Sequence, residues 1–216
     1  MDSKQLAQQL KKPTGDQGIQ VGEFMAKGNA NFYKQLPGLL HHKTYAKAYA
    51  TVLEIGMGSG FHIQELASQL SVNEYHAVDY SDLMVAQTIL NNKGLSILKA
   101  ANGNANNLSF ADNYFDLLFT INTVYFYDSL ETVFKEYYRV LKPGGLLVIG
   151  KRTKENLIEL SAFTQHGFAI LSAETVVNHL EICGFKIVQQ KTFDDPATEF
   201  KGGTVQLQSE FIIAKK

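Results

Sequence analysis

The chain has 216 residues, 45% of them hydrophobic, which is enough for one globular domain with a buried core. The chain contains twenty basic and twenty-one acidic residues, which gives a net charge of −1, and Arg139 and Arg152 are the only arginines. This balance argues against a nucleic-acid partner, because nucleic-acid binders carry a basic surface rich in arginine. The single cysteine, Cys183, has no partner for an internal disulfide, and no Cys/His cluster in the sequence indicates a zinc site.

The first fifty residues stand apart from the pattern that follows them. Residues Met1 to Lys12 are polar and lack the apolar core of a signal peptide, and no later stretch has the ~20 apolar residues that span a bilayer. We therefore expect a cytoplasmic protein with a polar, mobile N-terminus. Helical character over Gly22–Lys34 and Pro37–Ala50 predicts that residues 1–50 form a helical cap on a domain that comprises the whole chain, 1–216.

From residue 51 onward, short β-branched or aromatic runs alternate with helical patterns, which is typical of βαβ units and a parallel sheet. Seven strands are predicted: Thr51–Ile55, Tyr75–Asp79, Ser96–Ala100, Phe115–Asn122, Leu146–Gly150, Phe185–Lys191 and Gln208–Ala214. Helices are predicted over Gly60–Leu70, Asp82–Asn92, Leu130–Leu141 and Ala173–Ile182.

The ends of these elements carry recognisable signals. Ser81 and Ser172 can cap the second and fourth helices, Gly184 can end the fourth, and Pro143-Gly144-Gly145 breaks the third. Only loop residues Asp194 to Thr204 separate the last two strands, so these should pair antiparallel. Residues 51–216 are thus predicted to form an α/β core, a doubly wound, Rossmann-like, seven-stranded mixed sheet with its last strand antiparallel and helices on both faces.

A strand that runs into a glycine loop and a helix is the most informative segment, Val52-Leu53-Glu54-Ile55-Gly56-Met57-Gly58-Ser59-Gly60. Glycines let a ligand approach the backbone, and the helix N-terminus favours a carboxylate or phosphate. The dinucleotide fingerprint GxGxxG fails because Phe61 occupies the third glycine position, and no Walker A lysine follows. Asp79 ends the next strand, where it can accept hydrogen bonds from ribose hydroxyls or, alternatively, serve as a helix cap.

Five motifs in order resemble those of class I S-adenosylmethionine-dependent methyltransferases. They are Val52 to Gly60, Asp79, Gly103-Asn104-Ala105 with Leu108-Ser109-Phe110, Phe115-Asp116-Leu117-Leu118, and Tyr138-Arg139-Val140-Leu141-Lys142-Pro143-Gly144-Gly145. The resemblance covers about residues 50–150 and implies the same seven-stranded sheet. It implies S-adenosylmethionine as the cofactor, with these binding residues: Glu54, Gly56, Met57, Gly58, Ser59, Gly60, Asp79, Tyr80, Asn104, Ala105 and Asn122.

The resemblance also implies individual roles. Glu54 and the glycine loop would lie under the methionine part, Asp79 on the ribose, Tyr80 against the adenine, and Asn122 near the sulfonium. At the position of Asn104 the family commonly has an aspartate that accepts from the adenine amino group. An asparagine oxygen can accept the same hydrogen bond without charge, so weaker binding is expected.

The acceptor should lie beyond the carboxyl ends of the strands, where three segments are rich in aromatic residues. From these we predict an acceptor pocket that contains Tyr33, Tyr125, Tyr127 and His166. His41, His42 and His166 are candidate bases, whereas His62, His76 and His179 are expected to be structural. No catalytic residue is assigned, and no carboxylate cluster supports the magnesium-dependent methylation of catechols, so no metal is expected.

The sequence therefore predicts methyl transfer from S-adenosylmethionine to a small-molecule acceptor by in-line displacement, mainly through positioning of the reactants. A non-catalytic or regulatory protein that keeps the cofactor pocket is the alternative. A nicotinamide oxidoreductase is disfavoured by Phe61. A monomer and a homodimer both remain open.

Overall fold

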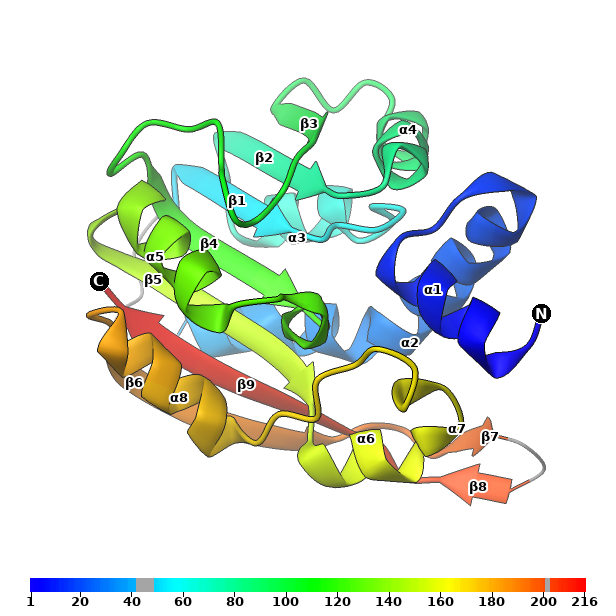
Figure 1. Cartoon of the computed structure of the whole chain (residues 1–216). Coiled ribbons are helices and arrows are strands. Elements are labelled where there is room, and N and C mark those ends of the chain that lie inside the picture. The colour runs from blue at the N-terminus through cyan, green and yellow to red at the C-terminus, as the bar shows by residue number, and fades with distance from the viewer. Residues whose placement is uncertain (42–48, 201–202) are drawn as a thin grey trace.

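Seven strands form one mixed sheet in the order β3-β2-β1-β4-β5-β9-β6 (Figure 1). The computed structural model describes residues 1–41, 49–200 and 203–216. The central strand β1 is parallel to both neighbours, so that Leu53 pairs with His76 of β2 and with Leu118 of β4. Strand β9 lies between β5 and β6 and is antiparallel to both. The predicted fold class, with helices on both faces, is confirmed.

The strand boundaries differ from the predicted ones mainly at β5. The sheet strands are β1 Thr51–Ile55, β2 Glu74–Asp79, β3 Leu98–Asn102, β4 Phe115–Ile121, β5 Leu141–Arg152, β6 Lys186–Asp194 and β9 Gln208–Lys215. Strand β5 begins at Leu141, which pairs with Phe115 ahead of a register shift. Pro143 and both following glycines thus lie inside an irregular strand start. The prediction that the strand begins at Leu146 was wrong, because backbone pairing with β4 overrides the local turn signal.

Four helices follow the predicted pattern and two short ones do not. The expected helices are α3 Ile63–Gln69, α4 Asp82–Asn91, α5 Leu130–Val140 and α8 Ala173–Ile182. Both predicted serine caps are present, since Ser81 Oγ accepts from Met84 N at 3.3 Å and Ser172 Oγ from Thr175 N at 3.1 Å. Helices α6 Lys154–Glu159 and α7 Ser161–Thr164, and the 3₁₀ turn η1 Val124–Phe126, were not predicted. The segment predicted as loop contains a hairpin, β7 Thr198–Phe200 and β8 Gly203–Val205.

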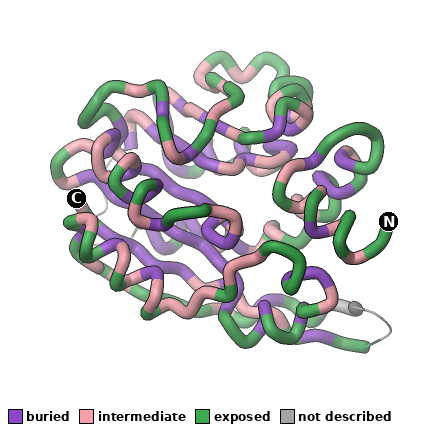
Figure 2. The backbone as a smooth tube through the Cα atoms, in the orientation of Figure 1, coloured by how far each residue is buried: buried purple, intermediate pink, exposed green. Residues whose placement is uncertain are grey.

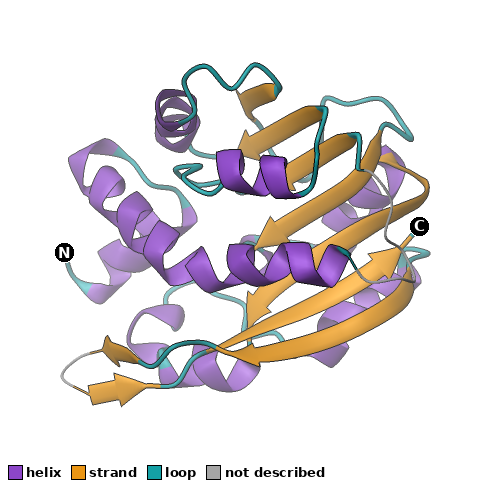
Figure 3. Cartoon of the chain, turned by 180° about the vertical axis from the view of Figure 1, so that it is seen from behind, coloured by secondary structure: helices purple, strands orange, loops and turns teal. Residues whose placement is uncertain are grey.

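The core has two parts, one on each face of the sheet, because successive strand residues point to opposite sides. Val52 packs with Phe32 and Ile63 beneath α2 and α3, whereas Leu53 packs with Tyr137 of α5 on the other face. Figure 2 shows that buried residues are concentrated in the central strands of the sheet. Helix α2 runs along one face of the sheet. Figure 3, which views the molecule from behind, shows this face.

The N-terminal region is more ordered than the sequence indicates. Helix α1 spans Ser3–Lys11, and Asp2 and Gln5 form a reciprocal capping box at its start. Helix α2 runs without a break over Gly15–Leu40 and includes Pro37 near its end. A helix, α1, therefore stands where a mobile N-terminus was predicted, and one continuous helix spans most of the two predicted stretches of helical character. Packing of α1 against α2 and α7 supplies the tertiary contacts that a polar sequence does not reveal. Part of the second predicted helix, residues 42–48, lies outside the described residues.

Candidate functional site

The glycine loop joins the end of β1 to α3 with its backbone open to a cavity. Gly56 has φ +78°, and a Cβ there would lie 2.3 Å from Thr123 Cγ2, so that only glycine fits. At Gly58, φ is +56° and a Cβ would meet no atom within 4 Å, because this residue faces the open space. The loop therefore leaves its backbone accessible from the cavity, and Gly58 forms part of the cavity wall.

Side chains of helix α4 donate hydrogen bonds to the carbonyl groups of the glycine loop. Thr88 Oγ1 donates to Gly58 O at 2.8 Å, and Asn91 Nδ2 donates to Ser59 O at 2.8 Å. Ser59 lines the cavity, yet its buried Oγ has no hydrogen-bond partner among the described residues. A buried hydroxyl of this kind is costly unless a ligand or water satisfies it. Gly60, in contrast, does not line the cavity, since it packs against Thr88 and Asn92.

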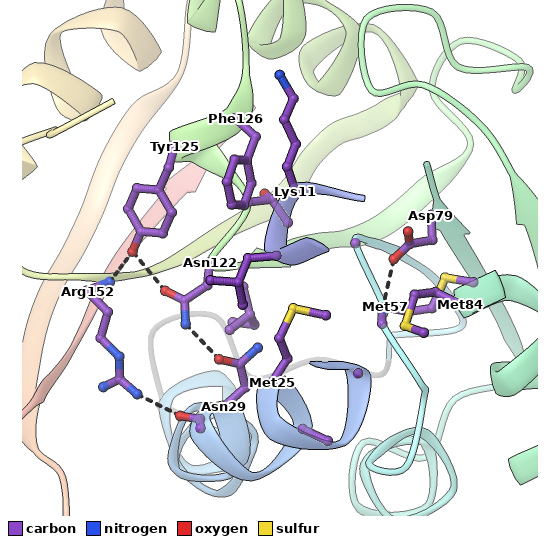
Figure 4. A pocket seen from close by; sticks show the side chains of 18 of the residues that line it. Lys11, Met25, Asn29, Met57, Asp79, Met84, Asn122, Tyr125, Phe126 and Arg152 are labelled. Carbon is purple, nitrogen blue, oxygen red and sulfur yellow. Dashed lines mark hydrogen bonds between the residues drawn. The ribbon is translucent and has the colours of Figure 1, made fainter. Parts of the chain in front are cut away.

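Asp79 lies at the end of β2 with both carboxylate oxygens engaged by backbone donors. Gly58 N donates to Oδ2 at 3.0 Å, and Ser81 N donates to Oδ1 at 2.9 Å. Burial nevertheless raises the pKa of Asp79 to about 6, because desolvation outweighs these hydrogen bonds. Each carboxylate oxygen keeps a lone pair for a ligand, and Asp79 lines the cavity (Figure 4).

Glu54 lies behind the cavity wall. It is 1% exposed and accepts from Tyr33 Oη at 3.1 Å and Tyr75 Oη at 2.7 Å, while His62 Nε2 lies 2.9 Å from Oε1. The rings of Tyr33 and His62 are stacked, with centroids 3.4 Å apart, and both line the cavity. Burial and the nearby Glu54 carboxylate hold the pKa of the Tyr33 phenol well above its usual range. Glu54 itself does not line the cavity, so it is placed to act on a ligand through Tyr33 and His62.

The predicted adenine-binding residues line the same cavity. Tyr80 is 50% exposed, and Lys12 Nζ lies 4.2 Å from the centre of its ring. Asn104 Oδ1 accepts from Asn106 N at 3.0 Å, so this side chain already stabilises its own turn. Ala105 is buried beside it. One lone pair of the Asn104 oxygen remains for an adenine amino group.

Asn122 has an uncommon backbone conformation at the end of β4. Its φ is +54°, a left-handed value that asparagine tolerates better than most residues. Its side chain bridges two elements, because Nδ2 donates to Asn29 Oδ1 of α2 at 2.8 Å and Oδ1 accepts from Tyr125 Oη at 2.8 Å (Figure 4). Strained residues of this kind cluster at functional sites.

The predicted acceptor residues divide into two groups. Tyr33, Tyr125 and Tyr127 line the cavity, whereas His166 is not among its lining residues. Tyr127 Oη bonds to Thr123 Oγ1 and Tyr137 Oη, each at 2.6 Å, and this ties the ring to the core. The placement of His166 in the pocket was wrong, because the segment after β5 forms α6 and α7 and turns the aromatic residues Phe163 and Phe168 inward instead.

The other histidines among the described residues do not lie at the acceptor side of the cavity. His41 is exposed and does not line the cavity, and His42 lies outside the described residues. His76 pairs with Glu74 at 2.9 Å, and His179 lines a separate, smaller cavity. Within residues 1–41, 49–200 and 203–216, no group of three His, Cys, Asp or Glu side chains is placed to hold a metal ion.

A buried ion pair at the far wall of the cavity was not predicted. The Arg152 guanidinium, at the end of β5, pairs with the Asp195 carboxylate and donates to Gly28 O of α2 at 2.6 Å. Asp195 also accepts from Asn31 Nδ2 at 2.5 Å and from Ser209 Oγ at 2.6 Å. No local sequence pattern marks this pair, because its members lie 43 residues apart.

One cavity of about 880 Å³ extends from the glycine loop to the Arg152–Asp195 pair. One part is walled by the glycine loop, Asp79, Tyr80 and residues 103–106. The other part is mostly apolar and lies between α2, η1, α6 and α7, with these side chains in its wall: Phe24, Met25, Phe126, Leu157, Leu160, Phe163, Phe168, Val205 and Leu207. Its volume falls at the upper end of the range of about 300–1,000 Å³ typical of ligand pockets.

Residues 53–149 match a family model described as a methyltransferase domain. The chain is 29% identical over 174 residues to a malonyl-[acyl-carrier protein] O-methyltransferase of Haemophilus ducreyi, and the match covers 75% of this chain and 65% of that protein. It is 29% identical over 162 residues to a 24-methylenesterol C-methyltransferase of Arabidopsis thaliana, covering 68% of this chain and 45% of that protein.

A chain of the Haloferax volcanii complex of the Trm112 methyltransferase activator shares the fold. The TM-score is 0.76 at 16% identity, and the superposition covers 90% of this chain and 94% of that one. In the described part of the chain, no helix has the length and apolar character needed to cross a membrane.

Proposed function

We propose that this chain is a class I, S-adenosylmethionine-dependent methyltransferase and that it transfers the methyl group to a small-molecule acceptor. The observation that carries the proposal is the cavity of about 880 Å³, which joins the glycine loop and Asp79 to a mostly apolar space under α2, α6 and α7. Helices α1 and α2 would act as the cap that covers both ligands. A cytoplasmic location and the absence of a nucleic-acid partner remain predictions.

The residues of the loop part fit the cofactor. Gly58 leaves open space where a side chain would block a ligand, and the buried Ser59 Oγ lacks a partner that a ligand's polar group could provide. Asp79 can accept from ribose hydroxyls, while Tyr80 and Ala105 offer apolar surface to the adenine. When bound, the cofactor supplies a sulfonium methyl group, which is an activated electrophile. The protein then has to align the acceptor and exclude water.

Cofactor affinity is expected to fall in acid. The pKa of Asp79 is about 6, and ribose hydroxyls donate to the ionised carboxylate, so that binding favours loss of the proton. Below pH 6 protonation competes with binding, and at pH 5 the affinity should be about tenfold weaker than at pH 7.5. Calorimetry with S-adenosylhomocysteine at pH 5.0, 6.0 and 7.5 measures this. A constant affinity across this range would contradict the assigned role of Asp79.

Methyl transfer itself is tested with a labelled methyl donor and a set of small acceptors that differ in nucleophile and in apolar area. Label in any acceptor supports the enzymatic function. The competing proposal is a non-catalytic protein that binds the cofactor. It is favoured by Asn104, whose side-chain oxygen already stabilises its own turn and carries no charge. Cofactor binding without transfer to any acceptor would support that alternative.

A further inference from the structure

A relay of hydrogen bonds determines which way the amide group of Asn29 faces. The backbone N–H of Arg152 can only donate, so the Tyr125 hydroxyl oxygen accepts from it. The single hydroxyl hydrogen of Tyr125 is then left for Asn122 Oδ1, at 2.8 Å. Asn122 must therefore turn its Nδ2 toward Asn29, where it donates to Oδ1 at 2.8 Å.

Asn29 consequently turns its amide nitrogen into the cavity. In Figure 4 this nitrogen points away from Asn122, on the side that holds Met25 and Met57. No hydrogen-bond partner for Asn29 Nδ2 exists among the described residues, although the side chain is partly buried and lines the cavity. The relay thus presents N–H donors where the loop part meets the apolar part. Such a group binds an oxygen and offers nothing to an ammonium group.

The charges around the apolar part also favour an anion. Arg152 and Asp195 neutralise each other. Three exposed lysines, Lys11, Lys27 and Lys34, line the cavity, and none forms an ion pair within the described part of the chain. The apolar part has one carboxylate without an ion-pair partner among the described residues, that of the exposed Asp128. The remaining wall is mostly apolar, so an anion here would belong to a largely apolar molecule.

The apolar part also lacks a buried base. His62 is the only histidine among the described residues that line the cavity, and its Nε2 is bonded to Glu54 on the loop side. The Asp195 carboxylate already accepts from three donors, Arg152, Asn31 and Ser209. An alcohol or an ammonium group must lose a proton before or during methylation, whereas a carboxylate is already ionised at neutral pH. The geometry therefore suits a nucleophile that needs no base.

We propose that the acceptor is an apolar carboxylic acid, methylated on oxygen, and that Asn29 binds its carboxylate. This inference rests on the proposed function and names the substrate class of the same cavity. One carboxylate oxygen accepts from Asn29 Nδ2, and an oxygen of the same group forms the bond to the methyl carbon. The carbon–sulfur bond breaks, its electron pair stays on sulfur, and no proton is transferred. The products are a methyl ester and S-adenosylhomocysteine.

The test compares three ten-carbon probes, decanoate, decanol and decylammonium. Calorimetry measures the binding of each probe to the full chain saturated with S-adenosylhomocysteine, and mass spectrometry detects methyl decanoate when S-adenosylmethionine is supplied. Decanoate should bind at least about tenfold more tightly than the other two. Asn29→Asp keeps the oxygen that accepts from Asn122 and replaces only the cavity-facing donor. It should weaken decanoate binding at least about tenfold, because a hydrogen bond to a charged group is replaced by repulsion between like charges.

The matched control is Gln20→Ala, an exposed residue of the same helix that does not line the cavity, and it should leave all affinities unchanged. Equal binding of the three probes, or unchanged decanoate binding in Asn29→Asp, would overturn the inference while leaving cofactor binding intact. Failure of the unmodified chain to bind S-adenosylhomocysteine would instead overturn the proposed function, and the inference with it.

Discussion

Replacing Asp79 by alanine should nearly abolish cofactor binding. The carboxylate is placed to accept two hydrogen bonds from ribose hydroxyls, each worth about 1.5–3 kcal/mol because the acceptor is charged. Loss of both should cost at least about 3 kcal/mol, which corresponds to an affinity more than about 100-fold weaker. Asp79→Asn should have a smaller effect, because the amide oxygen still accepts one hydrogen bond.

Calorimetric titration with S-adenosylhomocysteine measures the loss, and a thermal melt shows whether each variant is folded. Asp82→Ala is the matched control, since this exposed carboxylate lies three residues away, in the first turn of α4, and does not line the cavity. It should bind the cofactor as the unmodified protein does. A folded Asp79→Ala variant with unchanged affinity would show that the ribose lies elsewhere.

The second large effect is expected on stability, from breaking the Arg152–Asp195 pair. The Arg152 and Asp195 side chains are 9% and 7% exposed, so removing one leaves the other as an uncompensated buried charge. Asp195→Ala should lower the free energy of unfolding by about 3–5 kcal/mol. Asn31 and Ser209 donate to the Asp195 carboxylate and lose this acceptor in the same variant. Gln206 donates to the backbone oxygen of residue 195, which the variant keeps but no longer holds in position through the side chain.

Denaturant unfolding monitored by circular dichroism measures this cost. The control is the double variant Arg152→Met with Asp195→Leu, which removes both charges and keeps apolar volume. It should lose less stability than the sum of the single variants Arg152→Met and Asp195→Ala, because no charge is left unpaired. A cost below about 1 kcal/mol for Asp195→Ala would mean that the pair is effectively solvated.

Elements with strong local signals were predicted correctly. The buried run Val52–Ile55 and the serines that cap α4 and α8 act through neighbouring residues, so their effect can be read from the sequence. Helix α1 was missed because its polar sequence gives no apolar run, although packing against α2 and α7 orders it. Helices α6 and α7 are too short to show a clear period.

The candidate site was predictable where one segment supplies it. The glycine loop follows the first strand, and Asp79 and Tyr80 lie at the end of the second, its neighbour in a doubly wound sheet. Of these residues, only Gly60 does not line the cavity. The position of Glu54 behind the cavity wall was not predictable, because its three hydrogen-bond partners come from α2, β2 and the turn before α3. His166 was misplaced for a similar reason, since the path of its loop depends on which neighbouring residues are buried.

The sequence by itself determined the approximate positions of the seven sheet strands, the glycine loop and the acid that ends the second strand, because these depend on local conformational preferences and on side-chain periodicity. The tertiary structure alone decided the acceptor side. Asn29, Asn122 and Arg152 lie far apart along the chain and meet only when α2 packs across the ends of β4 and β5. Contacts of this kind depend on the shape and burial of the whole fold, which no local pattern encodes.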